Sequence, residues 1–178
     1  MCYIRVYEGG YTDCILFRHG IARDPEDWDG AEAKRPLTPH GAEKAEQAAR
    51  GLLSVEVEPT HLLSSPYVRA FQTAERIHAV LRISFAIKRC NDLVPDAPPH
   101  LLFDRLAEMP PDACVICVGH EPHLSAAAGL MLGAGPVAGL AFKKAGACCI
   151  RFEGTVKPGE GILRWWLMPA QLRALGKC

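Results

Sequence analysis

The sequence predicts an α/β domain in which a mostly parallel sheet lies between two layers of helices. Short apolar runs, such as Cys14 to Arg18 and residues 113–118, alternate with segments whose apolar residues recur at helical spacing. This alternation is typical of strand–helix–strand units, which place parallel strands side by side and cover both faces of the sheet. Neither an internal repeat nor a long linker divides the 178 residues, so we expect one domain over residues 1–178.

Two helices are predicted by their starts. Thr38 is a favoured N-cap residue, and Pro39 follows at the first helical position, where a missing N–H costs nothing. The dipeptide Ser65-Pro66 repeats this arrangement after a short strand, His61 to Ser64, and we expect its helix to run to about Leu81. The other expected elements are a strand at 85–88, a helix at 100–109, a central strand at 113–118, a helix from about 124, strands at 147–152 and 161–167, and a short helix from 169.

The first thirteen residues precede this pattern. Polar and apolar residues alternate in them, which fits either an added edge strand or a flexible extension. They lack a basic start followed by an apolar run and a small-residue cleavage site, so we expect no secretory signal and a cytoplasmic location.

Charge and hydropathy exclude two classes of partner. The chain has 20 basic residues (Lys and Arg) and 20 acidic residues (Asp and Glu). No overall electric field therefore draws it to nucleic acid or to an anionic membrane. The uncharged stretch from Leu124 to Phe142 is long enough to span a bilayer, but it contains four glycines and a proline. We interpret it as a buried helix followed by a glycine-rich turn.

The eight cysteines do not predict a metal site. The one CxxC, Cys114 to Cys117, lies in the apolar central strand, where residues three apart point to opposite faces. No second CxxC and no histidine at zinc-finger spacing accompany it, so structural zinc is not expected. We interpret the cysteines as small buried hydrophobic residues.

Polar residues follow separate predicted strands at the same end. Arg18 and His19 end the first strand, Arg69 lies on the helix after the second, and His120 follows the central strand. Ligands of open α/β sheets collect beyond these carboxyl ends, and the guanidinium fork suits phosphate oxygens. Each residue alone is more often a solvated charge or a structural histidine, but together they predict an anion site.

Four ordered motifs resemble the histidine phosphatase superfamily, with its phosphoglycerate-mutase-like fold. They are LFRHGIA from residue 16, RPLTPHG from 35, LSSPYVRAFQTAE from 63 and VGHEPHLS from 118. The short chain, RPLT, DLVP and the ending RWWLMPAQL are similar to the small phosphohistidine phosphatases of the SixA type. The resemblance extends from Cys14 to about Leu172.

The resemblance implies roles for particular residues. His19 would be the nucleophile that forms a covalent phosphohistidine, Arg18 and Arg69 would hold the phosphoryl oxygens, and His120 would be a further donor. No metal or cofactor is implied. By position Asp92 would be the general acid, where the small relatives tend to have Glu, and Asp24, Asp27 and Asp96 are competing candidates. Arg35 is either a substrate-docking residue or a solvated loop charge.

The predicted function is therefore a phosphatase of the histidine type. The leading interpretation is removal of phosphate from phosphohistidine on a signalling or phosphotransfer protein. Two further functions stay open: a phosphomonoesterase of the same superfamily that acts on a small phosphoester, and a non-catalytic domain that binds a phosphorylated ligand. We expect neither nucleic acid nor membrane as a partner.

Overall fold

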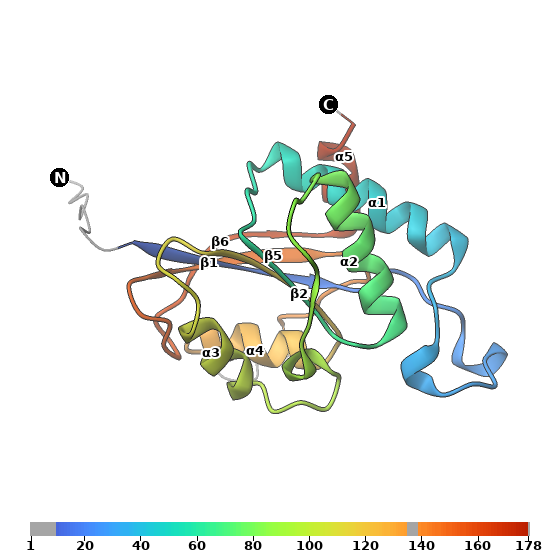
Figure 1. The fold of residues 1–178 in the computed structure, drawn as a ribbon, viewed down its shortest axis with the longest axis horizontal. Coiled ribbons are helices and arrows are strands. Elements are labelled where there is room, and N and C mark those ends of the chain that lie inside the picture. Colours follow the sequence, from blue (N-terminus) through green and yellow to red (C-terminus); the bar gives the residue numbers. More distant parts are fainter. Residues whose placement is uncertain (1–9, 135–138, 178) are drawn as a thin grey trace.

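A sheet between two layers of helices forms the protein (Figure 1). The computed structural model describes residues 10–134 and 139–177. Helices α1 (Pro39–Ser54), α2 (Val68–Val80) and α5 (Pro169–Leu175) cover one face, and α3 (His100–Ala107) and α4 (His123–Met131) cover the other. Three short 3-10 helices lie in loops, at Pro25–Asp27, Glu32–Lys34 and Asn91–Leu93.

The described strands form one six-stranded sheet in the order β3-β2-β4-β1-β5-β6. The first four strands in this order are parallel, whereas β5 pairs antiparallel with β1 and β6 pairs antiparallel with β5. The predicted mostly parallel α/β fold is confirmed. The strands are β1 (Tyr11–Arg18), β2 (His61–Ser64), β3 (Lys88–Arg89), β4 (Cys114–Gly119), β5 (Ala147–Glu153) and β6 (Ile162–Leu167).

The two faces of β1 supply two separate hydrophobic cores. Cys14 and Leu16 pack under α3 and α4, whereas Ile15 and Phe17 pack under α1, α2 and α5. Successive side chains of a strand point to opposite faces of the sheet, and both faces are covered here. All four side chains are therefore buried. β1 is thus fixed from both sides up to its last residue.

Several element boundaries differ from the prediction. β1 begins at Tyr11, so residues 11–13 belong to the sheet, while residues 1–9 of the expected extension lie outside the described residues. The expected strand at 85–88 pairs only at Lys88 and Arg89, which lie opposite Leu63 and Ser64. Before this pair, the Phe85 carbonyl oxygen lies 2.9 Å from Nε2 of His78 instead of joining the sheet.

The start of α2 also differs. Thr38 caps α1 as predicted, with its hydroxyl accepting from Gly41 N at 2.9 Å. Ser65 does not cap α2, which begins at Val68 after Tyr67. The Ser65 hydroxyl accepts from Tyr67 N only two residues on, a local turn that leaves Tyr67 extended.

The described cysteines are thiols in or beside the cores, without disulfides. Burial raises the pKa of Cys114 and of Cys149 to about 12. Within the described residues, no group of three or more His, Cys, Asp or Glu side chains could hold a metal ion. Likewise, no helix in that part of the chain is both long and apolar enough to cross a bilayer.

A close approach at Gly41 gives a test of the packing. A Cβ on Gly41 would overlap the carbonyl oxygen of Ile21, so α1 lies directly on the segment that follows β1. Alanine favours a helix by up to ~1 kcal/mol over glycine, but overpacking of this kind typically costs about 1–3 kcal/mol. We expect Gly41→Ala to lower the free energy of unfolding in urea.

Glu43→Ala, on the exposed side of the same turn, is the matched control and should change the free energy of unfolding by less than about 0.5 kcal/mol. A Gly41→Ala protein as stable as the wild type would show that α1 and Ile21 are less tightly packed than described.

Candidate active site

The carboxyl ends of β1 and β4 bring two histidines together. The strands are parallel neighbours with Arg18 opposite Gly119, and His19 N donates to the Gly119 carbonyl oxygen at 3.0 Å. The chain after β1 passes to the face covered by α1, and the chain after β4 passes to the opposite face with α4. Such a divergence opens a crevice at the end of the sheet. The ring centroids of His19 and His120 lie 4.9 Å apart across it.

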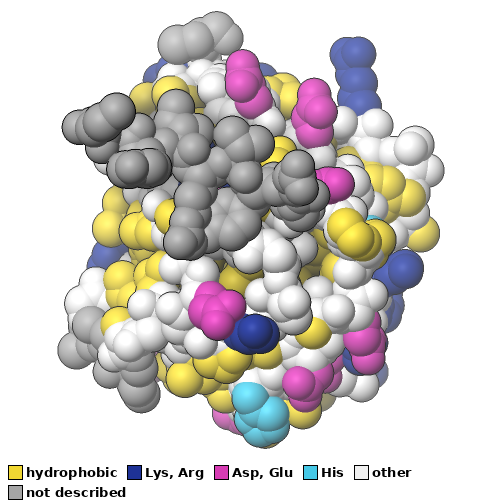
Figure 2. Space-filling model, turned by 90° about the vertical axis from the view of Figure 1, so that its left-hand side faces the viewer, with side chains coloured by type: hydrophobic (Ala, Val, Ile, Leu, Met, Phe, Trp, Pro, Cys, Tyr) yellow, Lys and Arg dark blue, Asp and Glu magenta, His cyan; other side chains and the backbone are white. Residues whose placement is uncertain are grey.

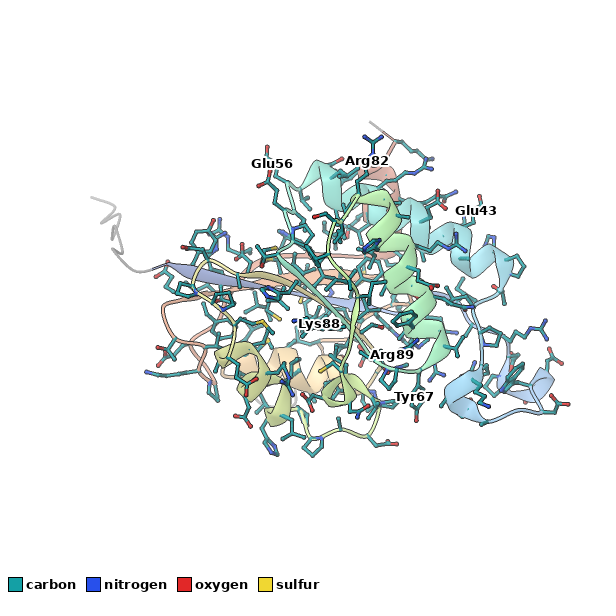
Figure 3. All side chains as sticks on the ribbon, in the orientation of Figure 1. Glu43, Glu56, Tyr67, Arg82, Lys88 and Arg89 are labelled. Carbon is teal, nitrogen blue, oxygen red and sulfur yellow. The ribbon has the colours of Figure 1, made fainter. Side chains whose placement is uncertain are left out.

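A cavity of about 360 Å³ fills this crevice and brings together Arg18, His19, Arg69 and His120. Figure 3 shows Tyr67, a further lining residue, at the end of the sheet where α2 begins. Its ring stands edge-on to His120 at 5.1 Å between centroids. The remaining lining residues are Glu32, Arg35, Pro95, Asp96, Glu121 and Lys144.

The backbone fixes the tautomer of His19. Its Nδ1 lies 2.7 Å from the Gly20 carbonyl oxygen, which can only accept, so Nδ1 carries the proton in the neutral ring. The lone pair is therefore on Nε2, which accepts from Arg69 Nε at 3.3 Å. The Gly20 amide donates to the Thr73 hydroxyl at 3.0 Å, which ties this loop to α2.

His120 is held by Ser65, the residue that the sequence predicts as the cap of α2. Its Nε2 lies 2.9 Å from the Ser65 hydroxyl oxygen. Its Nδ1 is buried and has no hydrogen-bond partner among the described residues. Buried polar groups in proteins are nearly always hydrogen-bonded, and this nitrogen belongs to a ring that lines the cavity.

Burial keeps both rings neutral. It lowers the pKa of His19 to about 3, with smaller contributions from the positive charges of Arg69, Arg18 and Lys144. Burial also lowers the pKa of His120 to about 2, and His19 and Arg69 act in the same direction.

Acidic and backbone groups hold the arginines of the cavity. Arg69 Nη1 donates to the Glu32 carbonyl oxygen at 3.0 Å and lies 3.1 Å from the Glu32 carboxylate. Arg35 grips the same carboxylate through Nε at 2.8 Å and Nη2 at 2.7 Å, and these hydrogen bonds lower the pKa of Glu32. Arg35 is thus a mostly buried partner of Glu32 rather than a solvated charge. Arg18 donates to the Phe142 carbonyl oxygen.

The structure does not bring Asp92 to this cavity. The Asp92 carboxylate accepts from Arg105 Nε at 3.2 Å and from the Cys90 thiol at 3.4 Å, and it lines a separate cavity near β3. The 3-10 turn that contains Asp92 directs the chain so that Asp96, four residues later, lines the cavity instead. Asp24 and Asp27 do not line the cavity either.

Three charged lining residues were not expected from the sequence. Glu32, Glu121 and Lys144 lie in segments whose composition is that of ordinary loops, and their contacts join residues far apart in the chain. Glu121 directly follows His120, and its carboxylate accepts from the Phe142 amide at 2.8 Å. In the sequence, only its position next to His120 indicates that Glu121 lies at the site.

Known proteins resemble this chain in sequence and in fold. The model of the histidine phosphatase superfamily (branch 1) matches residues 14–92. An uncharacterised protein of Picosynechococcus sp. is 33% identical over 114 residues, which cover 63% of this chain and 68% of that protein.

Two solved structures share the fold. The protein histidine phosphatase SixA, solved in complex with tungstate, has a TM-score of 0.78 at 23% identity and covers 90% of this chain and 99% of its own. A mycobacterial glucosyl-3-phosphoglycerate phosphatase has a TM-score of 0.68 at 16% identity, with 89% and 99% covered.

The neutral imidazoles give a testable pH dependence. We expect the rings of His19 and His120 to stay unprotonated down to about pH 4, because burial holds both pKa values far below the ordinary value of about 6.5. A titration followed by the ring nitrogen and carbon shifts in NMR checks this. A His19 ring that titrates near pH 6.5 would contradict the described burial.

The same shifts predict the sign of the effect on stability. As the pH falls below about 6.5, the two histidines bind protons in the unfolded chain but not in the folded one. Between pH 7 and pH 5 this difference should lower the free energy of unfolding by about 2 kcal/mol for each ring. His120→Gln should remove one such contribution from urea denaturation curves. An unchanged pH dependence in this variant would contradict the assignment.

Proposed function

We propose, on the premise that the chain belongs to the histidine phosphatase superfamily, that it hydrolyses phosphorylated substrates through a covalent phosphohistidine at His19. One observation carries the proposal: a buried, neutral imidazole directs its Nε2 lone pair toward a cavity that is lined by Arg18, Arg69 and His120. A nucleophile and a set of hydrogen-bond donors, cationic in the two arginines, are the parts that phosphoryl transfer requires.

In the first step, Arg18 and Arg69 hold the phosphoryl oxygens while His19 Nε2 attacks phosphorus. An N–P bond forms as the bond from phosphorus to the leaving group breaks. The backbone hydrogen bond from Nδ1 to Gly20 keeps the ring in place and stabilises the positive charge that develops on it. His120, with its unpartnered Nδ1, is a further donor to the transferring group.

In the second step, water breaks the N–P bond, which releases inorganic phosphate and restores the neutral ring. A leaving alkoxide needs a proton in the first step, and a general acid must lie in the cavity to supply it. We assign this role to Asp96 in place of Asp92, because Asp96 lines the cavity and is exposed, whereas Glu32 and Glu121 are held by hydrogen bonds.

We further propose phosphohistidine on a protein as the substrate. The similarity to the protein histidine phosphatase SixA supports this, because that structure is similar over 90% of this chain. A small phosphomonoester is the second candidate. The shared fold of glucosyl-3-phosphoglycerate phosphatase favours it, as does a cavity of about 360 Å³. A purely binding role is disfavoured, because phosphate binding alone does not need an unprotonated ring among arginines.

Substitutions at the cavity separate chemistry from binding. We expect His19→Ala to lower kcat by more than about 10³-fold, since the nucleophile is lost, while tungstate still binds with a Kd within about fivefold of the wild type. Arg69→Ala should weaken tungstate binding by about 10- to 100-fold, because a buried charge-assisted hydrogen bond is lost. Calorimetric titration with tungstate and steady-state kinetics measure both effects.

Trapping of the intermediate provides the decisive control. Brief incubation with a labelled phosphodonor should label the wild type, but not His19→Ala, with an acid-labile and base-stable phosphoryl group that maps to His19. Near-normal turnover by His19→Ala, or a label at another residue, would refute the mechanism.

The assignment of the acid predicts a dependence on the leaving group. Asp96→Asn should lower kcat/KM for phosphoserine, whose alkoxide needs a proton, by about 10²–10⁴-fold. It should lower kcat/KM for a phosphohistidine peptide by less than about tenfold, because an imidazole leaves more readily.

Asp92→Asn is the matched control. Its carboxylate is bound to Arg105 outside the cavity, so the ratio of the two kcat/KM values should equal that of the wild type. A change of the ratio in Asp92→Asn, and none in Asp96→Asn, would return the role to Asp92.

A further inference from the structure

A second cavity, of about 520 Å³, adjoins the candidate active site and carries an unusual charge. We call it the basic groove and define it by its six basic lining side chains. None of its lining residues is acidic. The six are Arg18, His40, Lys44, Lys143, Lys144 and Arg173.

The basic groove borders the cavity at His19. Arg18 and Lys144 line both cavities, so these two side chains form the boundary between them. The positive charge of Lys144 also helps to lower the pKa of His19, which places it within electrostatic range of the nucleophile. A molecule bound at His19 that extends past Arg18 and Lys144 would reach the basic groove.

The charges of the basic groove come from separate parts of the fold. Arg18 ends β1, Lys44 lies on α1, Lys143 and Lys144 precede β5, and Arg173 lies on α5. The two lysines before β5 are exposed, and none of these side chains forms an ion pair with the described residues. By contrast, Arg50, Arg105 and Arg151 each pair with a carboxylate.

This concentration of charge is unfavourable without an anion. The whole chain has as many acidic as basic residues, so the basic groove is a local excess rather than part of a basic protein. Like charges that share a cavity repel one another, and a bound anion relieves that repulsion. The nearest acidic side chain in sequence, Glu43, lies on the exposed side of α1 and accepts from Gln47 (Figure 3).

The opposite end of the molecule has no comparable feature in its described part. Figure 2 shows this end, where acidic and basic side chains lie scattered among hydrophobic ones. The described surface of this end therefore shows no basic cluster like that of the basic groove.

We propose that the basic groove binds acidic side chains of the protein that carries the phosphoryl group, and that it thereby selects phosphorylated residues flanked by Asp or Glu. This inference rests on the proposed function and names the substrate class of that same site.

The make-up of the basic groove favours a protein over other anions. Its charges are spread over four segments and include three flexible lysines, which suits several mobile carboxylates on a partner surface. A single small anion is usually held by convergent arginine forks. The lining contains no Phe, Tyr or Trp on which the bases of a single-stranded nucleic acid would stack.

Equilibrium binding tests the proposal without requiring turnover. Two fluorescent peptides of equal length carry a non-hydrolysable phosphonate analogue of phosphohistidine, flanked by four Glu residues in one and by four Gln residues in the other. At about 50 mM salt we expect the Glu peptide to bind the wild type about tenfold more tightly, because exposed ion pairs each contribute modestly. The preference should shrink at about 300 mM salt, where screening is stronger.

The matched variants locate the effect. Lys44→Gln with Arg173→Gln should reduce the preference to below about threefold. Lys157→Gln with Arg164→Gln removes the same charge from exposed positions outside the basic groove and should keep the tenfold preference. If the first pair impairs folding, as judged by circular dichroism, Lys143→Gln in the exposed loop replaces it.

Three outcomes would overturn the proposal: equal affinities for the two peptides in the wild type, a tenfold preference that survives in the groove variants, or tighter binding of an oligonucleotide of equal charge than of the Glu peptide. Hydrolysis of the corresponding phosphohistidine peptides is measured separately. A preference in binding without any hydrolysis would reject the proposed function and leave the groove proposal standing, and hydrolysis without a preference would do the reverse.

Discussion

The parallel pairing of β1 with β4 is the constraint on which the rest of the site depends. Arg18 faces Gly119 in register, and the amide of His19 donates to the Gly119 carbonyl oxygen. Each strand is buried on both faces, so a slip of one residue would move apolar side chains into the wrong core. The register that secures the cores therefore also sets the separation of His19 and His120.

Electrostatics at the site follow from the same burial. In water, a free imidazole is half protonated near pH 6.5. The residues packed around His19 exclude the water that a charged ring needs, so this ring stays neutral. The arginines around it favour a bound anion and disfavour a proton on the ring. One arrangement thus provides both the proposed nucleophile and the arginines proposed to hold the phosphoryl oxygens, and Glu32 keeps Arg69 in position.

Sequence patterns were sufficient wherever local chemistry decides the structure. The Thr38 cap, the apolar strands and the polar residues at their ends predicted the fold and the meeting of four side chains. The patterns failed where a distant contact decides. The sequence pattern predicts that Ser65 caps a helix, yet its hydroxyl lies beside the ring of His120. Its position in the sequence predicts Asp92 as the general acid, yet Arg105, thirteen residues away, donates to its carboxylate outside the cavity. The basic groove brings together lysines and arginines from separate segments, and none of these segments alone predicts an anion site.

The thiols of the described chain set this protein apart from enzymes that rely on a cysteine nucleophile. Such enzymes keep a thiolate in reach of solvent and lose activity when peroxide oxidises it. Here five of the six described cysteines are buried, and burial holds the pKa of Cys114 and of Cys149 near 12, so little thiolate forms at neutral pH. With a ring nitrogen as the proposed attacking atom, the chemistry proposed for His19 does not depend on a thiolate.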